Sequence, residues 1–138
     1  MHINPSPPKA GPGDEITVIV EAQIAGNGIS GSEIMVEFDP SMCQVIGLEP
    51  GELLGDSPLV GAEEIDNQRG AIHYASARKG MTQPTDCMGS LATINFKVND
   101  SSPNGTCNLT LKEVNLTNEQ FGEISGFAIQ NGVVEVVP

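Results

Sequence analysis

Residues 32–38 read Ser-Glu-Ile-Met-Val-Glu-Phe, and the alternation in this stretch decides the fold class. In an extended chain, successive side chains point to opposite faces of the sheet. One face of this stretch is therefore apolar and consists of Ile34, Val36 and Phe38. The other face consists of Glu33, Met35 and Glu37. A period of two with one apolar side predicts a β-strand that packs one face on a core.

The same period of two recurs in both directions from this stretch, and no segment shows helical periodicity. Alternating or short apolar runs occupy residues 15–24, 43–48, 71–77, 91–98, 109–114 and 133–137. Turn residues separate the runs, beginning with Asp39-Pro40 directly after the first stretch. Short strands with regular turns predict an all-β sandwich, here a single domain over residues 1–138. Two long stretches, 78–88 and 117–130, are irregular, and either has room for a turn of helix.

The composition is that of one globular domain with a strongly acidic surface. The chain has 138 residues, of which 38% are hydrophobic and 17% are charged. Its formal net charge is -12, from 18 acidic and 6 basic residues. Nucleic-acid binding and attachment to anionic membranes are disfavoured, because phosphate groups would repel such a surface. No apolar run approaches the roughly 20 residues of a membrane span.

Four N-x-S/T sequons favour a secreted protein, and they lie at Asn99, Asn104, Asn108 and Asn115. The first residues do not form a signal peptide, so we expect the chain to be a module of a longer secreted protein.

The chain has three cysteines, Cys43, Cys87 and Cys107, so at least one of them must stay unpaired. Their spacing matches neither a zinc site nor a C-x-x-C pair, which disfavours metal and redox roles.

The motifs that would indicate catalysis or cofactor binding fail. Residues 26–31 match G-x-G-x-x-G, but a strand follows them where a dinucleotide site requires a helix. Residues 100–111 begin like an EF-hand loop, but Leu111 holds its last ligand position; weak calcium binding by acidic loops stays open. The chain has two histidines and no serine in a nucleophile elbow. We therefore expect neither an enzyme nor a cofactor.

Six motifs follow one another in an order that points to one protein family. They occupy residues 13–20, 34–40, 45–51, 70–74, 89–98 and 111–114. Among them are Ile-Met-Val-Glu-Phe-Asp-Pro at 34–40 and Val-Ile-Gly-Leu-Glu-Pro-Gly at 45–51. On these motifs, which span nearly the whole chain, the sequence resembles a cohesin domain, the receptor module that binds dockerins. The resemblance implies a jelly-roll β-sandwich of about nine strands and a dockerin partner that carries the calcium.

The resemblance also implies a binding face, because in cohesins the face of strands eight, three, six and five receives the dockerin. Carried over strand by strand, this face comprises Glu33, Met35, Glu64, Asp66, His73, Ala75, Ala77, Arg78, Glu113 and Asn115. Its four acidic residues would give a negative field that favours a dockerin helix bearing Lys or Arg. Strand six carries alanines where cellulosomal cohesins tend to place bulkier side chains, which leaves the dockerin type and a cellulosomal setting open.

The implied topology places the starts of strands four and eight at one end of the sandwich. Any disulfide would then join Cys43 and Cys107 and leave Cys87 unpaired.

We expect an extracellular or cell-surface location. The alternative function is a carbohydrate-binding or cell-surface structural module, although one tyrosine and no tryptophan argue against a sugar platform. Exposed strands also leave a homodimer open.

Overall fold

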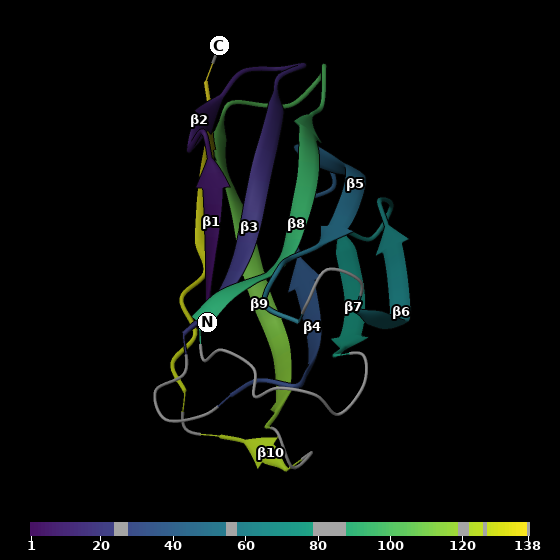
Figure 1. The fold of residues 1–138 in the computed structure, drawn as a ribbon. Helices are drawn as coiled ribbons and strands as arrows, with labels where there is room; N and C mark the ends of the chain where they lie inside the picture. Colours follow the sequence, from purple (N-terminus) through teal and green to yellow (C-terminus); the bar gives the residue numbers. More distant parts are fainter. Residues whose placement is uncertain (24–27, 55–57, 79–87, 119–121, 126, 138) are drawn as a thin grey trace.

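The computed structural model describes residues 1–23, 28–54, 58–78, 88–118, 122–125 and 127–137. These residues form eleven strands in two sheets that pack face to face (Figure 1). They form no helix, and hence none long and apolar enough to cross a membrane. The strands are β1 (His2–Ser6), β2 (Lys9–Ala10), β3 (Glu15–Gln23), β4 (Gly31–Glu37), β5 (Cys43–Pro50), β6 (Leu59–Asp66), β7 (Ala71–Ala77), β8 (Met88–Val98), β9 (Gly105–Thr117), β10 (Glu123–Ile124) and β11 (Gly132–Val136).

The two sheets differ in size. The smaller one has four strands in the order β1-β3-β8-β5. The larger one has seven, in the order β2-β11-β9-β4-β7-β6 with β10 paired to β9. Its central strands are antiparallel, whereas β2 and β11 run parallel. The predicted all-β sandwich is confirmed, and the eleven strands exceed the expected nine because β2 and β10 contribute two residues each.

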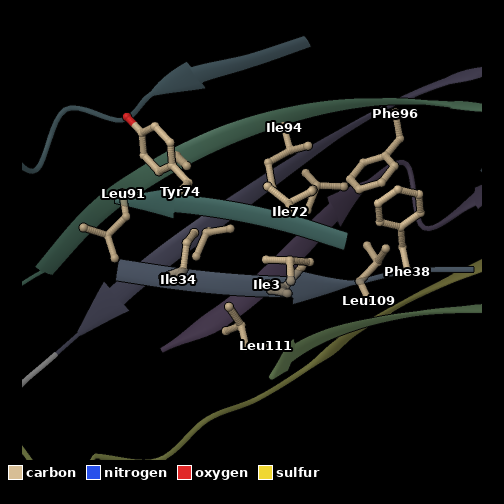
Figure 2. Packing of buried hydrophobic residues seen from close by; sticks show 14 of the residues in the cluster. Ile3, Ile34, Phe38, Ile72, Tyr74, Leu91, Ile94, Phe96, Leu109 and Leu111 are labelled. Atoms are coloured by element: carbon tan, nitrogen blue, oxygen red, sulfur yellow. The ribbon is translucent and has the colours of Figure 1, made fainter. Parts of the chain in front are cut away.

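The core lies between the sheets and is built from every second residue of the central strands. Ile34 and Val36 of β4 are 0% and 2% exposed, and Ile94 of β8, in the other sheet, is 0% exposed. The rings of Phe38 and Phe96 meet edge to face, with centroids 5.2 Å apart (Figure 2). Burying one such side chain contributes about 1.5–3 kcal/mol. The apolar half of the alternation therefore fixes which face of β4 stays outside.

The alternating pattern does not identify β1 and β6. β6 is an edge strand that pairs only with β7. Six of its eight residues are exposed, so both of its sides meet water and no period of two arises.

The irregular stretches 78–88 and 117–130 contain no helix in their described residues; β10 lies in the second one. Residues 79–87, 119–121 and 126 lie outside the described part.

The turn between β6 and β7 is connected to both sheets. The Asn67 side chain accepts a hydrogen bond from the Val45 amide at 2.7 Å and donates one to the Val45 carbonyl at 3.0 Å. This bidentate contact joins the turn to β5 of the smaller sheet. Gly70 has a φ of +76°, and a Cβ at this position would collide with the Phe38 carbonyl. The turn is thereby held close to the end of β4.

Candidate protein-binding site

Four neighbouring strands of the larger sheet, β9-β4-β7-β6, share one outer face. Their register forms a row across the strands that contains Glu113, Met35, His73 and Glu64. The adjoining row contains Asn115, Glu33, Ala75 and Ala62. This strand order is the one that the cohesin resemblance implies, with β4 between β9 and β7.

A bulge on β9 adds a positive charge to this face. Met35 is paired with Glu113, but the next residue, Val36, is paired with Leu111. Lys112 is therefore the extra residue of the bulge, and both it and Glu113 are exposed. The Lys112 Nζ donates a hydrogen bond to Glu37 Oε1 at 2.8 Å. An ion pair thus stands next to the apolar Met35 side chain.

The carboxylate of Glu33 is held from both sides at the centre of the face. His73 Nε2 lies 2.8 Å from Glu33 Oε2, and Asn115 Nδ2 donates to Glu33 Oε1 at 3.0 Å. His73 Nδ1 lies 3.8 Å from Glu64 Oε2 on the other side. The hydrogen bond between His73 and Glu33 lowers the pKa of the Glu33 carboxyl and raises the pKa of the His73 imidazole. The Glu33 carboxylate thus has two hydrogen-bond partners within the face, whereas the Glu64 side chain is 79% exposed.

A groove with a volume of about 930 Å³ opens on this face between β4, β7 and the β6–β7 turn. Ala71 lies between Glu37 and Asp66 in the register, and its single methyl group leaves room there. The charged side chains along the groove are Glu37, Glu64, Asp66, Arg69, Lys112 and Glu113. Because Lys112 is paired with Glu37, the remaining charge of the groove is mainly negative. Among the described residues, no three His, Cys, Asp or Glu side chains are placed to hold a metal ion.

All ten residues expected on the binding face lie in the described part of the chain. Seven of them lie in the two central rows: Glu33, Met35, Glu64, His73, Ala75, Glu113 and Asn115. Ala75 lies beside Glu33, and Asp66 lies one row further along, beside Ala71. Ala77 ends β7, and the amide of Arg78 after it donates to the Ser30 carbonyl at 2.8 Å. The last two residues are therefore peripheral to the groove.

Glu37, Ala71 and Lys112 are among the residues of this face that are absent from the sequence-based expectation. Glu37 continues the alternation of Glu33 and Met35, and Ala71 continues that of β7, so the period of two contained the signal for both. Lys112 carries no such signal, because a bulge arises from the pairing of two strands that are distant in the sequence.

Comparison with known proteins relates the chain to one family. The family model described as the Cohesin domain matches residues 3–136. The cellulosomal-scaffolding protein A of Acetivibrio thermocellus is 30% identical over an alignment of 131 residues that covers 91% of this chain. The chain spans only 6% of the length of that scaffolding protein.

Solved structures have the same fold at low sequence identity. A type II cohesin domain from the cellulosome of Acetivibrio cellulolyticus aligns with a TM-score of 0.83 at 16% identity, over 96% of this chain and 92% of its own. The sixth cohesin of scaffoldin B from that organism, in complex with a Cel5 dockerin mutant, gives 0.79 at 18% identity, over 99% and 96%. A non-cellulosomal cohesin from the archaeon Archaeoglobus fulgidus gives 0.74 at 18%, over 94% and 86%.

Proposed function

This chain belongs to the cohesin family, and from that membership we propose that it is a non-catalytic module that binds the dockerin domain of another protein. The binding surface is the outer face of β9, β4, β7 and β6. The observation that carries this proposal is the strand register, which brings seven of the ten expected residues into two adjoining rows. The similar cohesin fold that was solved with a dockerin supports the choice of partner.

The face favours a partner with an apolar side chain flanked by cations. Met35 is 36% exposed at the centre of the face, where interface hot spots gather, and its flexible thioether adapts to different contacts. Glu113 and Glu64 end the same row on either side. Glu33 adds less to the negative field when His73 is protonated, because the imidazolium 2.8 Å away offsets its charge. A dockerin helix with Lys or Arg on both sides of an apolar residue fits this row.

The proposed setting is a longer extracellular or cell-surface protein, of which residues 1–138 form one module. The similarity to a short part of a scaffolding protein supports this setting. We propose that calcium is carried by the dockerin. The carbohydrate-binding alternative gains no support, because Tyr74 is 0% exposed and neither central row contains a Phe, Tyr or Trp residue.

The test is titration calorimetry with a dockerin that binds the unaltered domain in the presence of calcium. Met35→Ala should weaken binding by about 2 kcal/mol, roughly 30-fold in Kd, as is typical of a central contact. The matched control is Ile46→Ala, because Ile46 is 48% exposed on β5 of the other sheet. Its Kd should stay unchanged.

Two results would contradict the proposal at different levels. Failure of the unaltered domain to bind any member of a panel of type I and type II dockerins would remove the function. Equal affinity of the unaltered domain and the Met35→Ala variant, with a loss for Ile46→Ala, would retain the function but move the binding site to the smaller sheet.

A further inference from the structure

Two cysteines from opposite sheets face each other in the core. Cys43 begins β5 of the smaller sheet, and Cys107 lies in β9 of the larger sheet. Both are free thiols in the structure, 1% and 0% exposed, with their Sγ atoms 3.1 Å apart. Since bonded sulfur atoms are about 2.05 Å apart, a relative shift of about 1 Å would suffice to join them.

The approach of the two thiols is fixed by strands rather than by loops. Cys43 is paired with Val98 in the smaller sheet, and its amide donates to the Asp39 carbonyl at 3.1 Å. Cys107 is paired with Val134 of β11 in the larger sheet. Each cysteine is therefore held by the backbone of its own sheet, and the contact of the sulfur atoms recurs whenever the two sheets pack.

We propose that Cys43 and Cys107 form a disulfide in the oxidised protein and so join the two sheets covalently. The oxidant is an external disulfide, R–S–S–R, such as oxidised glutathione. One cysteine thiolate attacks a sulfur of R–S–S–R and releases R–S⁻, and the second cysteine thiolate attacks the mixed disulfide and releases the other R–S⁻. The two cysteines lose two electrons and two protons, and the oxidant becomes two R–SH.

Burial decides when this reaction takes place. Neither thiol is accessible to an external disulfide in the folded sandwich. Oxidation therefore occurs while the chain folds, before the sheets close, and the finished bond is shielded from reductants. The two cysteines are 64 positions apart in the sequence, so the bond closes a long loop in the unfolded chain and should raise stability.

The experiment uses the Cys87→Ser variant, which leaves only the proposed pair. The variant is unfolded in denaturant and refolded with a mixture of oxidised and reduced glutathione. Mass spectrometry of a non-reduced digest should show the peptides of Cys43 and Cys107 linked, and the link should vanish after reduction. The oxidised form should melt roughly 10 °C above the reduced form. Cys43→Ala in the same background should melt at one temperature under both conditions.

The wild-type digest provides a second readout that does not depend on any variant. A Cys43–Cys107 link in the refolded wild-type protein supports the proposal, even where a substitution impairs folding. A link to Cys87 in the wild-type protein, or two alkylatable thiols in the refolded Cys87→Ser variant, would overturn it.

Discussion

The ion pair of His73 and Glu33 stabilises the folded domain only within a window of pH. The hydrogen bond to Glu33 raises the pKa of His73 in the folded protein. The contribution of His73 to stability is therefore complete below the ordinary imidazole pKa of about 6.5, and it is lost as the pH rises through the pKa in the folded protein. The pKa of Glu33 is lowered by the same hydrogen bond. Its contribution to stability is therefore present above the ordinary carboxyl pKa, and it is lost as the pH falls through the pKa of Glu33 in the folded protein. Both side chains are charged between about pH 4.5 and 6.5.

We predict that His73→Gln narrows the stability difference between weakly acidic and alkaline solution. In the wild-type domain, the free energy of unfolding should be higher at about pH 5.5 than at about pH 8.5, relative to the same difference in the variant. This extra stability should be at most about 1 kcal/mol, because the pair is partly exposed. Urea unfolding of both proteins at the two pH values measures this difference. His2→Gln is the control, because it replaces the second histidine of the chain, which lies in β1 of the smaller sheet. An equal difference in the wild-type protein and in His73→Gln would show that the pair does not contribute.

Ile34 has the opposite role to that of its neighbours Glu33 and Met35, because it is 0% exposed in the core. We predict that Ile34→Ala leaves a cavity and lowers the free energy of unfolding by about 2–5 kcal/mol. The outer side of β4 is chemically unchanged in this variant, so affinity for a dockerin should be retained below its melting temperature. Denaturant unfolding and titration calorimetry measure the two effects. A stability loss below about 1 kcal/mol would mean that Ile34 is not packed as the structure has it.

At the scale of elements, the β6–β7 turn lines one side of the groove, and the side chain of Asn67 joins this turn to β5. Asn67→Ala removes both hydrogen bonds to Val45 and leaves a backbone amide and carbonyl without these partners. We predict a loss of about 1–3 kcal/mol in the free energy of unfolding and a weaker affinity for the dockerin. Gln68→Ala, at an exposed position of the same turn, should leave the free energy of unfolding unchanged. Equal stability of the two variants would refute this role of Asn67.

The sequence predicts those elements in which one face is buried. The alternation identifies β4 and β7 and the outward direction of Glu33, Met35 and His73, because water and core act on opposite sides of these strands. It misses β6, because an edge strand meets water on both sides, and it misses the position of Lys112, because the bulge depends on pairing with β4. The strand order of the proposed binding face follows from the family resemblance and not from periodicity.

At the scale of the whole molecule, the excess of acid should act on the rate of association. The chain has a net charge of -12, and the exposed acids Glu64 and Glu113 end the central row on either side of Met35 and His73. An exposed field of this kind attracts a basic partner over roughly one Debye length, about 10 Å at 0.1 M salt. Salt should therefore slow association more than it speeds dissociation.

We predict that the association rate constant with a basic dockerin falls roughly tenfold between about 0.05 and 0.5 M salt, while the dissociation rate constant changes little. Stopped-flow mixing at several salt concentrations measures both constants. The double variant Glu64→Gln and Glu113→Gln should flatten this salt dependence, because it removes two charges next to the bound partner. Glu15→Gln with Glu49→Gln removes the same charge from exposed positions of the smaller sheet and should largely preserve it. An equal flattening by both pairs would assign the attraction to the net charge of the domain and not to this face.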